Sequence, residues 1–134
     1  MQTIETSRAE TRTAPIAAPP ATVLAVIADP RRLPEWAPAF AAAVAPEGDL
    51  WRVDTGGGDL LIDVQVVPHA GTVDLVRRGD TTTGARLRAL PSGGGTELLF
   101  TILFPRGVDD ATVAAQMETV ERELATVRAL AEAA

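Results

Sequence analysis

The side chains that most often carry catalysis are few in this 134-residue chain. His69 is the only histidine, and it lies in VVPHAGT, a sequence typical of a turn between two strands. There is no cysteine, and of the two serines, Ser7 and Ser92, the second falls in a glycine-rich turn. We therefore predict no Ser–His pair, no thiolate chemistry, no metal site and no bound cofactor.

Glycine and aspartate clusters are better explained by turns and helix caps than by chemistry. The glycine triplets at 56–58 and 93–95 lack a following Gly-Lys-Ser/Thr sequence and do not lead into a predicted helix, so we interpret both as hairpin turns. Asp109 and Asp110 stand side by side at the expected start of a helix, where carboxylates cap free N–H groups.

Composition and charge exclude several classes of partner. The net charge is −6, whereas nucleic acids and anionic membrane surfaces require clustered basic residues. The N-terminal MQTIETSRAETRT is too polar for a signal peptide, and no apolar run approaches the roughly 20 residues of a membrane span. The absence of cysteine fits a reducing compartment. We expect one soluble, cytoplasmic domain over residues 1–134, without a nucleic-acid partner or a membrane span.

The second half of the chain predicts an antiparallel sheet. Its alternating runs are joined by short turn sequences, and connections this short exclude parallel crossovers. The runs are LWRVDT (50–55), DLLIDVQVV (59–67), TVDLVRR (72–78), ARLRAL (85–90) and TELLFTILF (96–104). A weaker strand is expected within residues 2–14, where Pro15 limits its length.

Two short helices and one long helix are predicted around these strands. The first begins at Pro20, buries Val23, Leu24 and Ile27 on one face and ends at Pro30. Asp29 then caps a very short helix over PRRL. The long helix begins at Asp109 or Asp110; its buried stripe is Val113, Met117, Val120, Leu124 and Val127, and Glu118, Glu121 and Arg122 are exposed, with Glu118 pairing with Arg122.

In this order the segments resemble the START-like, Bet v 1-type (SRPBCC) superfamily, which includes polyketide cyclase/dehydrase and lipid-transport proteins. The resemblance rests on APPATVLAVIADPRRLPEWAP, GGGTELLFTILF and VERELATVRAL and covers essentially the whole chain. It implies an α+β helix-grip fold: a curved antiparallel sheet of about six or seven strands, two short helices after strand 1 and a long C-terminal helix. It also implies a strand over residues 38–45, although the alanines of AFAAAVA favour a helix.

The same resemblance explains why three prolines surround Trp36. The chain has to turn sharply from the first helix back to the sheet, and Pro30, Pro34 and Pro38 fix that turn. Trp36 is expected to fill the corner between helix, sheet and turn, and its N–H requires a partner. That corner borders the mouth of the superfamily's cavity, so Trp36 is also a candidate ligand contact.

Strand alternation predicts which side chains face this cavity. The candidate ligand-binding residues are Trp36, Phe40, Trp51, Val53, Ile62, Val64, Leu75, Arg77, Leu87, Phe100, Ile102, Met117 and Val120. Arg77 is the leading polar candidate, at the interior or at the rim, and no interior group is expected to titrate between roughly pH 6 and 9. The inward face of strand 1 stays open, because Ile16 shares its parity with Arg8, Glu10 and Arg12.

Three functions are compatible with these observations. The first is binding of a small, mostly apolar, lipid- or polyketide-like molecule between sheet and helix. The second is an aromatase/cyclase-type enzyme in which Arg77 stabilises an enolate-like oxygen, although the superfamily's cyclases generally depend on polar cavity groups that this sequence lacks. The third is a protein-interaction module that uses Leu99 and Leu103. The chain is expected to be a monomer or a homodimer.

Overall fold

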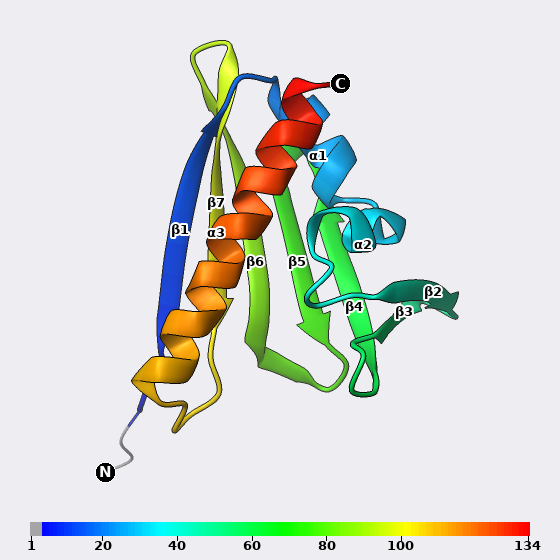
Figure 1. The fold of residues 1–134 in the computed structure, drawn as a ribbon, viewed down its shortest axis with the longest axis vertical. Helices are drawn as coiled ribbons and strands as arrows, with labels where there is room; N and C mark the ends of the chain where they lie inside the picture. The colour runs from blue at the N-terminus through cyan, green and yellow to red at the C-terminus, as the bar shows by residue number, and fades with distance from the viewer. Residues whose placement is uncertain (1–3) are drawn as a thin grey trace.

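The computed structural model describes residues 4–134 (Figure 1). Its helices and strands follow in this order: β1 (Ala9–Ile16), α1 (Pro20–Ile27), a 3₁₀ helix (Pro30–Arg32), α2 (Leu33–Trp36), β2 (Ala43–Glu47), β3 (Leu50–Asp54), β4 (Asp59–Val67), a second 3₁₀ helix (Pro68–Ala70), β5 (Thr72–Arg77), β6 (Asp80–Ser92), β7 (Gly95–Leu103) and α3 (Asp110–Glu132).

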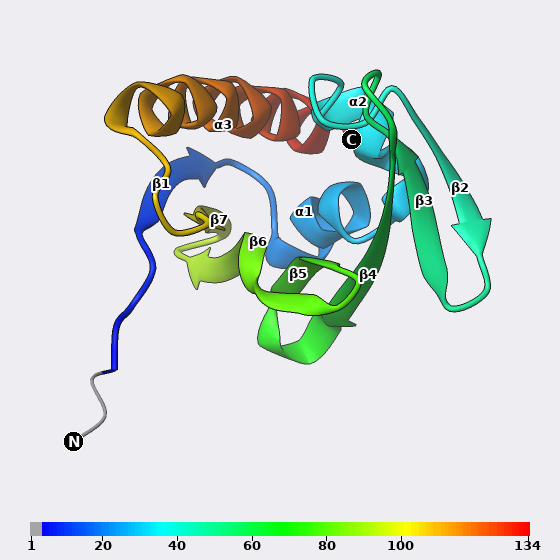
Figure 2. The same cartoon turned by 90° about the horizontal axis from the view of Figure 1, so that it is seen from below.

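The strands form one antiparallel sheet of seven strands in the order β1-β7-β6-β5-β4-β3-β2. The sheet curves, and Figures 1 and 2 show α3 lying across its open side, with α1 and α2 between the end of α3 and the β4–β5 side. The β2–β3 hairpin projects away from α3. The predicted α+β helix-grip fold is therefore confirmed. No helix within residues 4–134 has the length and hydropathy to cross a membrane.

Strand β1 extends beyond its predicted C-terminal end, and its burial pattern shows which face points inward. The predicted segment included residues 2 and 3, which lie outside the described residues, and was limited by Pro15, whereas the strand continues through Pro15 to Ile16. An edge strand tolerates this proline because the missing N–H faces away from the sheet. Glu10 and Ile16 share the inward face with Arg12, whose guanidinium lies 3.4 Å from the Glu121 carboxylate of α3.

The strand expected over residues 38–45 is wrong over its first half. Residues 38–42 form a turn, because the N–H groups of Phe40 and Ala41 donate to the carbonyl of Ala37 at 3.0 and 2.9 Å. Pro38, without an N–H, starts this turn. Strand β2 begins only at Ala43 and runs to Glu47. Neither the helix favoured by alanine propensity nor the full strand forms there.

Strand β6 begins five residues before its predicted start, at Asp80 instead of Ala85. The threonines after Asp80 were interpreted as a loop, but they extend the hairpin with β5. Across that hairpin the register shifts between Leu75 and Arg77. Gly84 allows this irregularity: its φ is +99°, and a Cβ there would lie 2.6 Å from the carbonyl oxygen of Leu75. Only glycine fits without strain.

Replacing Gly84 with alanine should therefore lower the free energy of unfolding by about 1–3 kcal/mol, since the new methyl group meets backbone at a positive φ. Chemical denaturation would measure the loss. Gly57→Ala is the control, because a Cβ at Gly57 meets no atom within 4 Å. Equal midpoints for the two variants would show that β6 does not approach β5 in this way.

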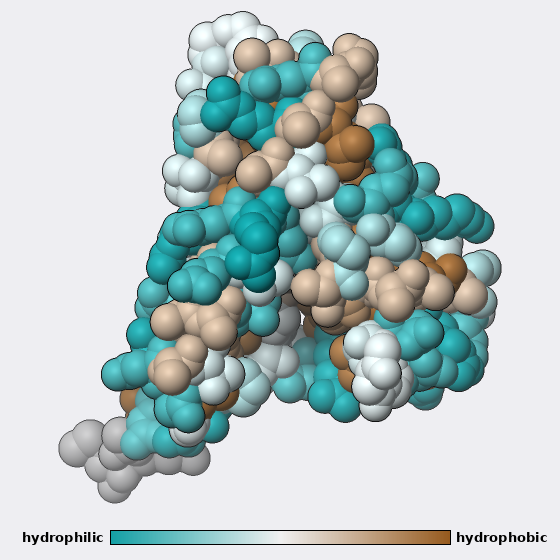
Figure 3. All heavy atoms as spheres, viewed as in Figure 1, coloured by the Kyte–Doolittle hydropathy of each residue, from teal (hydrophilic) through white to brown (hydrophobic). Residues whose placement is uncertain are grey.

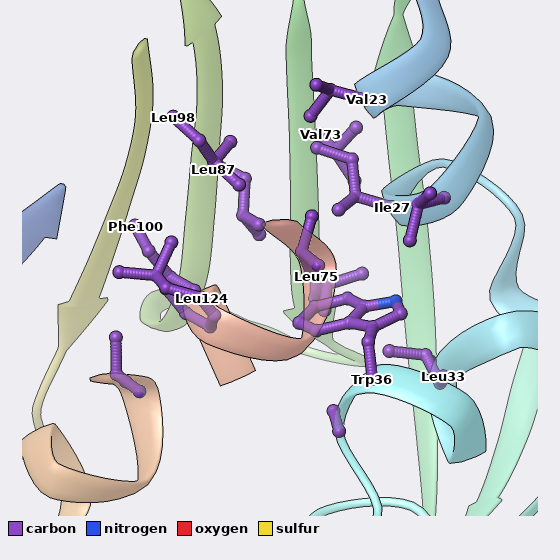
Figure 4. Packing of buried hydrophobic residues seen from close by; sticks show 14 of the residues in the cluster. Val23, Ile27, Leu33, Trp36, Val73, Leu75, Leu87, Leu98, Phe100 and Leu124 are labelled. Carbon is purple, nitrogen blue, oxygen red and sulfur yellow. The ribbon is translucent and has the colours of Figure 1, made fainter. Parts of the chain in front are cut away.

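Apolar side chains of the helices pack against apolar side chains of the sheet and form the core (Figure 4). In α3 the predicted stripe is buried, and Glu118, Glu121 and Arg122 are exposed. Asp109 caps the helix by accepting the N–H of Thr112 at 2.7 Å.

Two helix details differ from the predictions. Arg122 donates to the Thr119 hydroxyl and does not pair with Glu118. In α1 the buried residues are Val23, Val26 and Ile27, so Val26 replaces Leu24 on the inward face. Asp29 caps the short 3₁₀ helix as expected, by accepting the N–H of Arg31.

Candidate functional site

A cavity of about 250 Å³ lies between the concave face of the sheet, α2 and α3. Figure 3 shows this side of the molecule hollowed between the lower half of α3 and the side of α2 and β2. Strands β4 to β7 supply most of its wall, and the wall is mainly apolar. Several of the predicted ligand-binding residues line it: Trp36, Phe40, Ile62, Leu75, Arg77, Phe100 and Ile102.

The other candidate residues do not reach this cavity: Trp51, Val53, Val64, Leu87, Met117 and Val120. Val53, Leu87, Met117 and Val120 are buried in the packed core. Helix α1 contacts β6, and in Figure 4 its Val23 lies against Val73 of β5, the strand next to Leu87. Alternation identifies the concave face, but α1 and α3 already fill much of that face. Trp51 lies outside the cavity, with the guanidinium of Arg31 4.8 Å from its ring centre.

Trp36 is both a corner anchor and a wall of the cavity. It is almost completely buried and packs edge-on against Phe100, with ring centres 6.1 Å apart and planes at 72°. The expected partner for its N–H is not found: among residues 4–134 no acceptor lies within hydrogen-bonding distance. In Figure 4 the indole nitrogen is on the side of Ile27 and Leu33, among aliphatic groups. The proline-flanked turn thus holds an aromatic ring against the sheet at the cavity.

Arg77 stands at the rim of the cavity. It lines the wall and is nevertheless exposed to solvent. No carboxylate of the described residues lies within ion-pairing distance of its guanidinium. The pKa of Asp80 is lowered mainly by hydrogen bonds from Thr82 and Thr83, and Arg77 adds a smaller lowering. The sequence left the interior and the rim of the cavity open for Arg77, and Arg77 lies at the rim.

Sequence alternation missed the polar side chains that α3 and β6 bring to the cavity: Thr83, Gln116 and Glu123. Glu123 is the most unusual, because only 6% of it is exposed. Burial raises its pKa from 4.5 to about 7, against a smaller lowering by Arg122. The prediction that no interior group titrates between roughly pH 6 and 9 is therefore wrong.

A sequence signal for these residues existed. Gln116 and Glu123 are seven residues apart, so they lie on the same face of α3, two turns from each other. Glu123 also falls between Val120, Leu124 and Val127 of the buried stripe, where a solvent-facing residue is not expected. The position of Glu123 within the apolar stripe, and not its residue type, was the signal that could have indicated its burial.

The remaining candidates for chemistry lie at the surface. His69 is exposed in the 3₁₀ helix between β4 and β5, as expected of a turn. The glycine triplets form the β3–β4 and β6–β7 hairpin connections. Within residues 4–134, no three His, Cys, Asp or Glu side chains gather in a way that would hold a metal ion.

A curved antiparallel sheet closed by a long C-terminal helix, with an apolar cavity between them, defines the helix-grip class of proteins. The family model for polyketide cyclase/dehydrase and lipid transport matches residues 8–132, and the chain belongs to this family. No curated protein sequence matches the chain.

Solved structures share this fold at low sequence identity. The Zhui aromatase/cyclase from Streptomyces sp. R1128 is 19% identical, with 93% of each chain covered and a TM-score of 0.70. A START superfamily protein from Mycobacterium smegmatis is 18% identical, with 92% of this chain and 97% of that one covered and a TM-score of 0.71. The Aha1 dimer from Colwellia psychrerythraea is 16% identical, with 92% of this chain and 96% of the Aha1 chain covered and a TM-score of 0.69.

Proposed function

We propose that this protein binds a small, mostly apolar, lipid- or polyketide-like molecule in the cavity between the sheet and α3. The observation that carries the proposal is the open, mainly apolar cavity beside Trp36 and Phe100, in a domain otherwise packed around a continuous core. Membership of a family that includes lipid-transport proteins supports it.

The size of the cavity limits the ligand. Its 250 Å³ is below the ~300–1,000 Å³ typical of pockets for drug-sized ligands, so one or two rings or a medium-length chain fit better than a sterol. A ligand that buries about 300 Å² of apolar surface gains about 7.5 kcal/mol at 25 cal/mol per Å². Immobilisation reduces this gain, which predicts dissociation constants from micromolar to millimolar.

Filling the cavity should abolish binding. Ala85 lines the wall from β6, so Ala85→Phe places a ring where the ligand would lie. Leu99→Phe is the control, because Leu99 is half-buried on the opposite face of the sheet. Fluorescence-displacement and thermal-shift titrations with naphthalene derivatives, medium-chain fatty acids and sterols would measure both. Equal binding by the two folded variants would place the ligand elsewhere, and no binding by wild type would defeat the proposal.

An aromatase/cyclase-type enzyme is the second candidate. The observation that favours it is the presence of an acid, Glu123, and a cation, Arg77, at the same cavity. The Zhui neighbour is named as such an enzyme. In this alternative the cavity orients a poly-β-keto substrate, and Arg77 stabilises the enolate-like oxygen that develops.

Arg77→Ala separates the two candidates. For a binding protein it should weaken affinity modestly and mainly for ligands with an acidic or keto oxygen, because Arg77 is exposed at the rim. For a cyclase it should leave binding largely intact and lower turnover by about a hundredfold or more. Equilibrium titration and a turnover assay with a poly-β-keto substrate measure the two effects. No detectable turnover by wild type with any such substrate would count against the enzyme.

The interaction-module alternative has less support. Leu99 and Leu103 are half-buried, and the large apolar side chains that are well exposed within residues 4–134 are Ile4, Val67 and Leu90. That the chain is a monomer or a homodimer stays a prediction, and analytical ultracentrifugation would measure its molar mass in solution.

A further inference from the structure

Glu123 is a buried acid that the fold itself does not use. The buried polar side chains of the described residues are Thr96 and Glu123. Thr96 is satisfied, because its hydroxyl donates to the carbonyl of Ala18 at 2.8 Å. Within residues 4–134, the carboxyl group of Glu123 has neither a hydrogen-bond partner nor an ion pair, and it lines the cavity. Among residues 4–134, the side-chain polar atom that is fully buried without a partner is Trp36 Nε1, so the unpartnered Glu123 oxygens keep accessible surface and open onto the cavity.

The charged groups around Glu123 leave its carboxyl group without a neutralising cation. On α3 the nearest is Arg122, which points outward and is exposed. Helix α1 has no titratable side chain, and on α2 the only one, Glu35, is exposed and paired with Arg32. On β1 Arg12 is paired with Glu121 and Glu10.

Among residues 4–134, the inward face of β7 carries no titratable side chain, and the one cation in the cavity wall is Arg77 at the rim. Burial without a paired cation favours the neutral carboxyl group. A neutral carboxyl group donates one hydrogen bond and accepts others.

We propose that Glu123 is a specificity-determining residue that holds a neutral hydroxyl or carbonyl oxygen of the ligand inside the cavity. This inference rests on the proposed binding function and narrows it to apolar molecules with an uncharged oxygen at the inner end. A ligand carboxylate at that end would face a second acid, and the like charges would repel each other. An ammonium group would lose its hydration in a wall that is otherwise mainly apolar.

A hydroxyl and a carbonyl oxygen should respond differently to pH. A hydroxyl can donate to the carboxylate or accept from the neutral acid, so it binds in both states of Glu123. A carbonyl oxygen only accepts, so it requires the protonated acid. Binding of a ketone should thus weaken as pH rises through about 7, where burial places the Glu123 pKa, while binding of an alcohol changes less.

Five naphthyl probes test the inference by calorimetric titration of the folded chain: naphthalene, naphthol, naphthyl methyl ketone, naphthoate and naphthylmethylamine. We expect wild type to bind naphthol about tenfold more tightly than naphthalene. Glu123→Leu should reduce this ratio to about one, and Glu123→Gln, which still donates and accepts, should keep most of it and remove the pH dependence of ketone binding. Glu118→Gln, exposed on the same helix, should leave every ratio unchanged.

Naphthoate distinguishes the role of Arg77 at the rim from that of Glu123 inside the cavity. It should bind with its carboxylate at Arg77, so Arg77→Ala weakens naphthoate and leaves the naphthol-to-naphthalene ratio intact. Equal ratios in wild type and Glu123→Leu would overturn the role of Glu123 while naphthalene binding still supports the cavity. Tighter binding of naphthylmethylamine than of naphthol would also overturn it, in favour of a cationic ligand. No binding by any probe would overturn both proposals.

Discussion

Replacing Glu123 with glutamine should stabilise the protein at about pH 8.5 by up to about 3 kcal/mol and change its stability little below about pH 4.5. Burial raises the pKa of Glu123 from 4.5 to about 7. Between these two pH values the folded state therefore holds a proton that the unfolded state has released. The free energy of unfolding of wild type therefore falls as pH rises from 4.5 through 7. Glutamine has no proton to lose and avoids this fall.

Urea denaturation of both proteins over this pH range would measure the difference. Taking the difference between variant and wild type cancels the titration of the other carboxylates. Glu118→Gln serves as the control, since Glu118 is exposed on the same helix. A Glu123→Gln difference that stays constant from pH 4.5 to 8.5 would show that Glu123 is solvated in the folded protein.

Leu124→Ala should cost about 2–5 kcal/mol of stability. Leu124 is only 3% exposed and lies near Phe100 between α3 and the sheet (Figure 4). It does not line the cavity, so its removal creates a new void and does not enlarge an existing space. Denaturation by guanidinium would measure the loss, with half-buried Leu130→Ala on the same helix expected to cost less. A loss at Leu124 below about 1 kcal/mol would contradict the packing of α3 on the sheet.

The fold was largely predictable because its strands and long helix have clear periodicities. Strand β4 begins and ends where the sequence predicted, since Gly58 and Pro68 flank a regular alternation. The errors occur where local hydrogen bonds compete with periodicity. The carbonyl of Ala37 accepts two N–H groups and turns residues 38–42, and no alternation rule contains that information.

The candidate site was predictable only in part. Alternation predicts which face of the sheet a side chain lies on, but it does not predict whether a helix packs over that side chain or leaves it open to the cavity. Ile62 and Leu75 line the cavity, whereas Leu87, on the same concave face, is covered by the core around α1. Glu123 was missed because acidic residues on a helix are usually solvated. Its position within the apolar stripe of α3 was the stronger signal.

The most direct test of the binding site is to observe contacts between protein methyl groups and a bound ligand. Isotope-filtered NMR of the protein with naphthol should give cross-peaks from the ligand to Ile62, Leu75 and Ile102, which line the cavity from three different strands. Leu61 and Leu99, on the outer face of the sheet, should give none. Cross-peaks confined to the outer face, or none at a saturating ligand concentration, would contradict a ligand site between the sheet and α3.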